Sequence, residues 1–491
     1  MTSDPVFASG FPLRDHHTLI CGAATAAFPI IVVRYYNSPW RKLPPGPPGL
    51  PIIGNALEMR GPFWEKFADW RWTYGDVFYL SAMGDLVVVL DSLKAATDLF
   101  DRRAANYSDR PRLIAGPEVM SGGLVIGFQS TGPLWRRMRK ASHGALSNKG
   151  VLEQMDHDKA YEAVRLALYL LEEPSHYHDH INCVTASLIL STTYGTPATS
   201  KDDETMKLSR EWSERLERTL AIGAHLVATF PSLKHVPRRF AKWRREAEAW
   251  FLGLLEGVQA DMDAGVDRPC LASVILRSDE TRNSLSRLEK AWTAGFIYGA
   301  GIDTVATTFE WWMLAMIAHP AAQARAQAEL DTVVGRARAP TMADLPDLPY
   351  VRATGMVIPA GTIVIPNIWA VNRELYGAGA DADAFEPARH LNARGELDTR
   401  DEGHVTYGFG RRICVGRGVA NASLAMHAAV TLWACMLGRA YDDRGRAVPV
   451  DVEGYALVGL VMRPVPFKCS IIPRFPDAPH ILAEEREMRK R

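Results

Sequence analysis

Apolar residues along this chain recur mainly at the three- and four-residue spacing that is typical of amphipathic helices. The pattern predicts helices over residues 92–104, 133–146, 160–171, 204–227, 240–262, 288–318, 321–333 and 419–437. The stretch 288–318 is the most apolar of them, and His319-Pro320 ends it because proline cannot continue a helix. Pro133 suits the first position of its helix, and Asp91 or Ser92 suits the cap of the 92–104 helix.

Strand signals are few. Runs of β-branched and aromatic residues at 77–80 and 86–90 predict a hairpin, which residues 83–85 join. Short β segments are predicted near residues 362–366 and 455–461. The sequence therefore predicts a fold that is mainly α with small β-sheets.

The N-terminal segment carries the targeting signal of this chain. Residues 16–33 hold no formally charged side chain and are apolar from Leu19 onward, and eighteen residues is the lower limit for a spanning helix. More basic residues follow the stretch than precede it, which places the C-terminal side in the cytoplasm. Ala24-Thr25-Ala26 would also suit the cleavage site of a secretory signal. We interpret the segment as a single membrane anchor.

Proline and glycine dominate the next stretch, Leu-Pro-Pro-Gly-Pro-Pro-Gly at 43–49, which predicts a stiff spacer instead of a helix or strand. No comparable linker appears later in the 491 residues. The predicted parts are an anchor over residues 1–40, a hinge over residues 41–49 and one large domain over residues 50–491.

Composition narrows the function classes. With 47% hydrophobic residues, the chain can bury a large core. The chain has 56 Lys+Arg and 56 Asp+Glu residues. This balance argues against a nucleic-acid-binding protein, which would show an excess of basic residues. Six cysteines lie far apart without a C-x-x-C pair, which suits a reducing compartment where one thiolate can serve a metal.

One cysteine stands in an unusual segment, Tyr-Gly-Phe-Gly-Arg-Arg-Ile-Cys-Val-Gly at 407–416. A cysteine is more often a small buried hydrophobe, but Cys414 comes just before a predicted helix, whose free N–H groups stabilise a thiolate. Arg411 and Arg412 add positive charge that suits a thiolate and the carboxylates of a cofactor. Three glycines permit tight turns and let the backbone approach a flat cofactor closely: Gly408, Gly410 and Gly416.

This segment resembles the haem-binding signature of the cytochromes P-450, with Tyr407 where phenylalanine is usual. The resemblance implies a cytochrome P-450 fold behind the N-terminal membrane anchor. It also implies haem b as the cofactor, with the Cys414 thiolate as the axial ligand of the iron and Arg412 as a partner of a haem propionate.

The apolar helix 288–318 contains Ala-Gly-Ile-Asp-Thr at 300–304, which resembles the oxygen-activation motif of the same family. The resemblance implies that Gly301 opens a local distortion, that Thr304 holds oxygen or water, and that Asp303 feeds a proton relay. The residues alone leave another interpretation open. Thr304 could bond back to the preceding turn while Asp303 pairs with a distant arginine.

Two further segments resemble the family in its usual order. Trp135 and Arg139 match a W-x-x-x-R helix, and their spacing of four places both on one helix face, from which they would reach the propionates. Phe-Glu-Pro-Ala-Arg-His at 385–390 matches F-x-P-x-R and contributes Arg389 as a structural residue. Phe296, Ile297 and Ala300 predict an apolar substrate pocket. The resemblance covers residues 43–473.

One departure from the family pattern is serious. A helix with E-x-x-R normally follows a segment like Leu-Pro-Tyr-Val-Arg-Ala-Thr at 348–354, but here Gly355 and G-x-x-I-P-x-G-T follow directly. Glu162 with Arg165 and Glu386 with Arg389 share the spacing but lie at the wrong places. Arg389 therefore loses its usual acid and must find another acid or stay in water. A skipped exon or faulty gene structure explains this best, since every flanking motif is intact.

The resemblance implies a monooxygenase that inserts one atom of O2 into an apolar small molecule of terpenoid, polycyclic aromatic or fatty acyl type. Electrons would come from NADPH through the flavins of a cytochrome P-450 reductase, with cytochrome b5 as a further partner, at the endoplasmic reticulum membrane with the catalytic domain in the cytoplasm. Two alternatives stay open. The chain could be an O2-independent haem-thiolate isomerase or dehydratase, or a non-catalytic or misfolded product that lacks the E-x-x-R helix.

Overall fold

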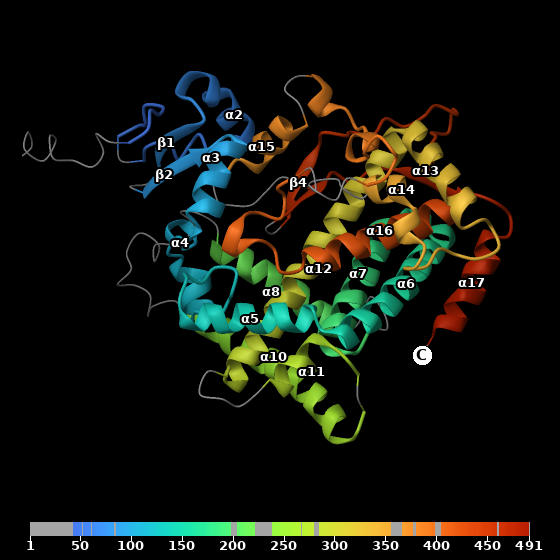
Figure 1. Cartoon of the computed structure of the whole chain (residues 1–491), viewed down its shortest axis with the longest axis horizontal. Helices are drawn as coiled ribbons and strands as arrows, with labels where there is room; N and C mark the ends of the chain where they lie inside the picture. Colours follow the sequence, from blue (N-terminus) through green and yellow to red (C-terminus); the bar gives the residue numbers. More distant parts are fainter. Residues whose placement is uncertain are drawn as a thin grey trace, which may run out of the picture. The chain divides into compact units, whose positions relative to one another are not determined.

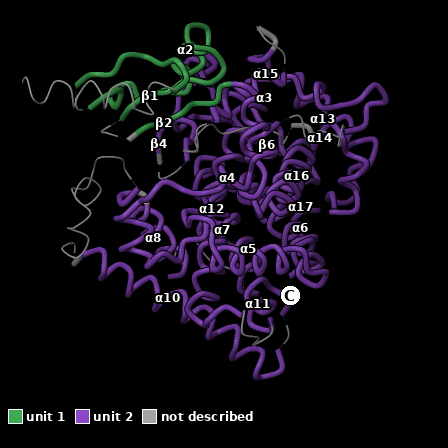
Figure 2. The backbone as a smooth tube through the Cα atoms, turned by 60° about the vertical axis from the view of Figure 1, so that its left-hand side comes forward, with its two compact units in different colours: residues 1–91 green, residues 92–491 purple. Residues whose placement is uncertain are grey.

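The computed structural model divides the chain into two compact units, residues 1–91 and residues 92–491 (Figure 2). The parts of the chain that it describes are residues 43–51, 53–59, 61–82, 85–197, 204–220, 238–266, 268–278, 284–354, 366–376, 380–397, 404–458 and 461–490. The predicted anchor over residues 1–40 lies outside these ranges. Within them, no helix combines the length and apolar character that a membrane crossing needs.

The smaller unit is built on a helix and a hairpin. Helix α2 (Phe63–Tyr74) packs against strand β1 (Val77–Ala82). Strand β1 pairs antiparallel with β2 (Asp85–Leu90), with Val77 opposite Leu90 and Ala82 opposite Asp85. The predicted hairpin is confirmed. The Pro/Gly spacer forms neither helix nor strand, as predicted, but it is bonded to the hairpin, because the Tyr79 amide donates to the Pro45 carbonyl at 3.0 Å.

The larger unit is mainly helical, which agrees with the predicted fold class. Its helices are α3 (Leu93–Thr97), α4 (Ala104–Tyr107), α5 (Pro133–Leu146), α6 (Lys149–Glu172), α7 (Tyr177–Tyr194), α8 (Glu204–Leu220), α10 (Arg238–Asp263), α11 (Leu271–Arg277), α12 (Arg287–Ala318), α13 (Pro320–Val333), α14 (Pro349–Thr354), α15 (Ile368–Leu375), α16 (Arg417–Ala434) and α17 (Ala478–Arg489). Two antiparallel pairs of strands complete it, β3 (Cys435–Arg439) with β6 (Cys469–Pro473), and β4 (Tyr455–Val458) with β5 (Val461–Pro464). Short helical turns include two π-helical segments, Asp98–Arg102 and Ile114–Met120.

Helix α12 crosses the middle of this unit (Figure 1) and packs against α7, α10, α16 and β5. A capping box fixes its start, since the Ser286 side chain accepts from the Glu289 amide and the Glu289 carboxylate accepts from the Ser286 amide. Trp292 and Trp312 on α12 and Trp433 on α16 are among the largest fully buried side chains. The predicted helix 288–318 is confirmed, and its burial on most sides explains why it is so apolar.

Two glycines let other helices approach α12 closely. A Cβ atom at Gly295 would lie 2.4 Å from the Phe251 ring of α10, and one at Gly299 would lie 2.6 Å from the Trp212 ring of α8. Aromatic rings therefore occupy the space that larger side chains would need. The same residues explain why α8 and α10 can lie against the segment that carries Ala300 and Thr304.

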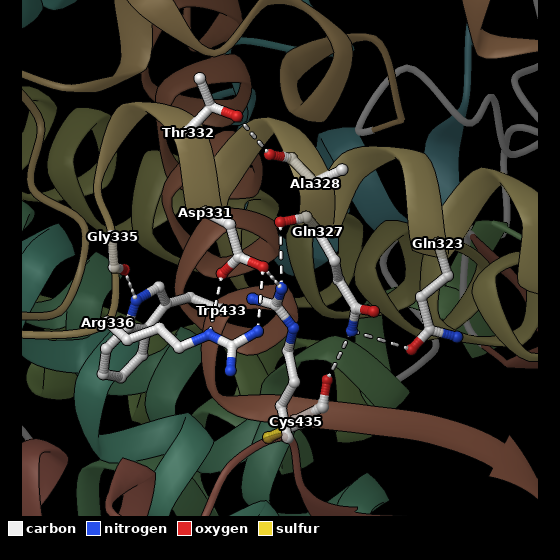
Figure 3. A network of polar contacts seen from close by, with 10 residues as sticks. Gln323, Gln327, Ala328, Asp331, Thr332, Gly335, Arg336, Trp433 and Cys435 are labelled. Carbon is white, nitrogen blue, oxygen red and sulfur yellow. Dashed lines mark hydrogen bonds and ion pairs between the residues drawn. The ribbon is translucent and has the colours of Figure 1, made fainter.

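A polar network joins α13 to strand β3 (Figure 3). The Gln323 side chain accepts from the Leu437 amide and donates to the Leu437 carbonyl, both at 2.9 Å, and Gln327 donates to the Cys435 carbonyl at 3.1 Å. These hydrogen bonds occupy the backbone groups of Cys435 and Leu437 that a longer α-helix would use for its own hydrogen bonds. The predicted end of the last apolar helix at residue 437 is therefore wrong, because α16 stops at Ala434 and the chain turns into β3.

Other boundaries also differ from the prediction. Helix α6 begins at Lys149 instead of residue 160, since the Asn148 side chain caps it by accepting from the Val151 amide. Helix α7 was not predicted, because buried serines and threonines interrupt its apolar pattern. Between the predicted helices 92–104 and 133–146, the chain forms the π-helical turn Ile114–Met120. The end of the predicted helix 204–227 and most of the predicted strand 362–366 lie outside the described residues.

Replacing Gly295 by alanine should destabilise the fold by about 1–3 kcal/mol, since the new methyl group meets the Phe251 ring. Gly257→Ala on α10 is the matched control, because no atom lies within 4 Å of its added Cβ. Alanine in an open helical position should stabilise by up to about 1 kcal/mol. Urea unfolding midpoints of both variants test this, and equal stabilisation by the two changes would contradict it.

Candidate functional site

The loop before helix α16 carries Cys414 in a tightly turned backbone. Gly408 and Gly410 have φ angles of 77° and 50°, in the region that glycine adopts without strain. A Cβ atom at Gly410 would lie 2.1 Å from the Phe100 carbonyl oxygen, so no larger residue fits. The Cys414 amide donates to the Tyr407 carbonyl at 2.9 Å and closes the loop.

Cys414 lies at the start of α16, and its side chain is exposed. Surrounding protein raises the pKa of its thiol, although the amide groups of Gly416 and Arg417 and the charges of Arg139 and Arg417 act in the opposite direction. A Cβ atom added at Gly416 would lie 3.9 Å from the Cys414 Sγ, an ordinary contact, so the space beside the sulfur does not require glycine there. The helix start thus lowers the pKa as predicted, but desolvation of the sulfur by the surrounding protein has the larger effect.

Two arginines fasten the Cys414 loop to neighbouring segments. Arg139 on α5 donates through Nη2 to the Ile413 carbonyl. Arg412 donates through Nε to the Ser108 carbonyl at 2.7 Å and through Nη2 to the Gln129 carbonyl at 2.6 Å. Its guanidinium lies 4.2 Å from the centre of the buried Trp135 ring. The structure thus brings together all three residues that the sequence analysis assigned to the haem propionates.

Arg110 is a fourth residue of this group that the sequence analysis missed. Burial lowers the pKa of Arg412 to about 10, and the charges of Arg110 and Arg139 add to that effect while Asp109 opposes it. Arg110 itself donates through Nε to the Gly127 carbonyl at 3.1 Å. Three half-buried cations that repel one another suit a ligand with two carboxylates. The donor set, one cysteine sulfur and this arginine cluster, therefore fits a haem with its two propionates.

On helix α12, a partly open stripe interrupts an otherwise buried surface. Ala300 and Thr304 are exposed one turn apart, and Phe296 and Ile297 are half-buried one turn before them. The Phe296 ring lies against Gly127, where an added Cβ would meet it at 2.7 Å. The stripe is apolar except for the Thr304 hydroxyl, which agrees with the predicted substrate-facing positions.

The Thr304 hydroxyl donates to the Ala300 carbonyl at 2.9 Å, so the back-bond that the sequence left open is present. The side chain of Asp303 is 39% exposed, and its Oδ1 lies 3.6 Å from the Nη2 of Arg463 on β5. Burial raises the pKa of Asp303, while Arg463, a hydrogen bond from Ser213 and the charge of Arg210 act to lower it. Both side chains thus have structural partners, and both remain accessible enough to act on a ligand.

The distortion that we expected at Gly301 is absent, because α12 is α-helical through this residue. An added Cβ at Gly301 would lie 3.0 Å from Ile189 of α7. The glycine therefore serves the packing of two helices.

Arg389 adopts an arrangement that the sequence analysis did not anticipate. It donates to the carbonyls of Glu386 at 3.2 Å, Tyr376 at 3.5 Å and Ala384 at 2.6 Å, and lies 5.2 Å from the Tyr376 ring centre. Three of the partners of this guanidinium are thus main-chain oxygens, which the sequence did not predict.

The upstream E-x-x-R pair is a structural element of another region. Glu162 and Arg165 of α6 form a buried ion pair at 3.1 Å, and Ser187 of α7 donates to Glu162 at 2.6 Å. Burial raises the pKa of Glu162 to about 7. The pair stabilises the contact between α6 and α7 and, as predicted, does not replace the missing one.

Comparison with known proteins gives a consistent result. The family model described as cytochrome P-450 matches residues 44–355 and 353–435. Two proteins of Armillaria gallica, both named cytochrome P-450 monooxygenase, are 46% and 42% identical to this chain over 93% and 95% of its length, and the matches cover 94% and 97% of those proteins. A cytochrome P-450 monooxygenase of Amanita muscaria is 33% identical over 91% of this chain and 94% of its own length.

The same comparisons bear on the departure near Thr354. The family model matches in two parts that meet at residues 353–355. The first Armillaria alignment spans 494 positions and includes 93% of the 491 residues of this chain, or about 457. About 37 aligned positions therefore have no residue of this chain opposite them. The second spans 503 positions with 95%, about 466 residues, and again leaves about 37. Both observations agree with a segment that relatives have and this chain lacks.

Arg110→Gln should weaken haem binding roughly tenfold or more, because a charge-assisted bond contributes about 1.5–3 kcal/mol. The haem-free chain should keep or gain thermal stability, since one of three repelling cations is removed. Arg112→Gln is the control, as Arg112 is exposed and already paired with Glu118. Absorbance titration with haem and thermal unfolding measure the two effects. Lower stability with unchanged haem affinity would assign Arg110 to loop structure alone.

Proposed function

This chain belongs to the cytochrome P-450 family of haem-thiolate monooxygenases, and we propose that it inserts one oxygen atom into an apolar small molecule, with Cys414 as the ligand of the haem iron. The observation that carries the assignment of the ligand is the Cys414 loop, where an exposed sulfur, two glycines with positive φ and the arginine cluster converge. Bound haem supplies the activation of dioxygen, which the thiolate ligand promotes.

The chain's own residues hold the cofactor and the substrate in this proposal. Arg412, Arg139 and Arg110 bind the propionates, and Trp135 supports Arg412 by lying beneath its guanidinium. Phe296, Ile297 and Ala300 contact the substrate from α12, and their apolar side chains favour a terpenoid, a polycyclic aromatic or a fatty acyl chain.

Thr304 and Asp303 take part in the proton transfer of the reaction. One oxygen atom enters the substrate and the other leaves as water, which requires two electrons from NADPH and two protons. The Thr304 hydroxyl donates to the Ala300 carbonyl and can still accept a hydrogen bond at the exposed stripe of α12. Asp303, the preceding residue, is exposed enough to exchange protons with water. An O2-independent isomerase or dehydratase would need no proton relay to bound dioxygen.

Cys414→Ala or Cys414→His should abolish the red-shifted absorption band of the reduced, carbon monoxide-bound protein, because the thiolate ligand produces that band. Cys469→Ala is the control and should retain it, since this half-buried cysteine lies on β6. An intact band in Cys414→Ala would overturn the assignment.

Electrons reach the haem, in this proposal, from an NADPH-dependent flavin reductase that docks beside the Cys414 loop, with cytochrome b5 as an additional donor. Arg136 and Lys140 of α5 are exposed, while Arg139 between them is half-buried and bonds to the loop. Exposed Arg417 at the start of α16 adds to the same charge. These cations suit an acidic partner surface.

Reversing two of these charges with Arg136→Glu and Lys140→Glu should slow reductase-supported turnover, most strongly at low salt. Turnover supported by added hydrogen peroxide should be unchanged. Lys242→Glu with Arg245→Glu makes the same charge change on exposed positions of α10 and should leave both activities unaltered. Equal losses in both assays for the α5 variant would mean that the pair supports the fold.

We also propose that residues 1–40 anchor the chain in the endoplasmic reticulum membrane, with the catalytic part in the cytoplasm. The apolar stretch 16–33 and the excess of basic residues after it support this arrangement. Such an anchor would concentrate apolar substrates and the reductase on one surface.

The second candidate is a non-catalytic product, and the two-part family match favours it. Without the E-x-x-R helix, the loop that carries Cys414 lacks a brace that the family resemblance implies. Removing partners from a buried charge network costs about 3–5 kcal/mol, a large part of the net stability of a domain.

The chain as written should therefore bind haem poorly and show little activity. Transcript reads across Thr354–Gly355 should contain an in-frame segment of about 37 codons with E-x-x-R, the length that both Armillaria alignments leave unmatched. Expression with that segment restored should raise haem content. Transcripts without it, together with a stable thiolate–carbon monoxide spectrum of the 491-residue protein, would contradict this account.

A further inference from the structure

We propose that Glu310, two turns after Asp303 on α12, is a positioning residue that holds Arg463 and thereby keeps the Asp303 carboxyl free to transfer protons. The inference rests on the proposed role of Asp303 and names the residue that controls it. Glu310 and Arg463 do not belong to any motif that the sequence analysis identified.

The Arg463 guanidinium lies closer to the Glu310 carboxylate than to the Asp303 carboxylate. Its Nη1 lies 2.9 Å from the Glu310 Oε1, within hydrogen-bond range, whereas its Nη2 lies 3.6 Å from the Asp303 Oδ1, beyond that range. The side chains of Arg463 and Glu310 are 9% and 3% exposed, so their charges interact with little screening by water. Glu310 therefore neutralises most of the arginine charge.

Three elements fix this arrangement. Asn182 of α7 accepts from the Arg463 Nη2 at 3.1 Å, and His178 of the same helix places its Nδ1 2.8 Å from the Glu310 Oε1. The Trp311 Nε1 donates to the Met462 carbonyl at 2.8 Å and holds β5 against α12. The guanidinium thus has little freedom to move toward Asp303 while Glu310 is charged.

Asp303 faces several other groups that affect its proton. Ser213 and Arg210 of α8 and Arg463 of β5 favour its charged form, and burial opposes them. Removing the charge of Glu310 would leave Arg463 buried with Asp303 as the nearest acid. The pair should then tighten, because an uncompensated buried charge is costly, and Asp303 would stay deprotonated and directed at Arg463.

Infrared spectroscopy of the expressed chain, with or without haem, measures this effect directly. The carbonyl band of protonated Asp303 is identified by its loss in Asp303→Asn, and its intensity is followed with pH. In Glu310→Gln the midpoint should fall by about one pH unit or more, which corresponds to about 1.4 kcal/mol. Glu310→Asp should restore part of the shift.

Glu162→Gln is the matched control, since it also neutralises an acid of a buried ion pair, 3.1 Å from Arg165, but on α6. It should destabilise the fold without moving the Asp303 midpoint. Should Glu310→Gln fail to fold, the double variant Glu310→Gln with Arg463→Gln removes both charges and should raise the midpoint above that of the parent chain. An unchanged midpoint in the foldable variant would overturn the inference.

A second readout separates this inference from the proposed function. In haem-loaded protein, Glu310→Gln should lower the yield of product per NADPH and increase the solvent isotope effect, as Asp303→Asn should. If Asp303→Asn leaves both unchanged while the midpoint still shifts in Glu310→Gln, the proton role of Asp303 is wrong and the link through Arg463 stands. If Asp303→Asn acts as expected and Glu310→Gln does not shift the midpoint, the proton role of Asp303 stands and the link through Arg463 is wrong.

Discussion

The binding of main-chain carbonyls by Arg139 and Arg412 is the interaction on which the candidate site depends. Through it, helix α5 and the segment around Ser108 and Gln129 are fastened to the loop that carries Cys414. Each guanidinium is half-buried, so its bonds to carbonyls are less weakened by water than those of a surface arginine. Haem carboxylates would complete a group of cations that the protein alone leaves short of negative charge.

Local patterns predicted much of this structure, and long-range contacts account for what they missed. The apolar run of α12 and the glycines around Cys414 are readable in the sequence because each follows from local backbone geometry. The end of α16 is not, since Gln323, more than a hundred positions earlier, binds the backbone of Leu437. Arg463, the partner of Asp303, also lies more than a hundred positions from it, so the sequence predicted only that some distant arginine would pair with Asp303.

Arg389 shows that a segment beside the break can keep its local structure. Its guanidinium donates to three main-chain carbonyls, those of Glu386, Tyr376 and Ala384. Every motif beside the break keeps its sequence, which is why inspection of motifs alone would judge the chain complete. The two-part match to the family model points to residues 353–355, and the number of unmatched positions in both alignments agrees with a missing segment.

The bonds from Gln323 and Gln327 to strand β3 have a consequence for behaviour at high concentration. A pair of strands exposes amide and carbonyl groups along its free edge, and such an edge can recruit a strand from another molecule. Here two side-chain amides from α13 occupy the Leu437 and Cys435 backbone groups, so β3 has fewer groups to offer. Because Met436 and its cross-strand neighbour Ile472 are exposed apolar side chains, this edge would otherwise favour intermolecular aggregation.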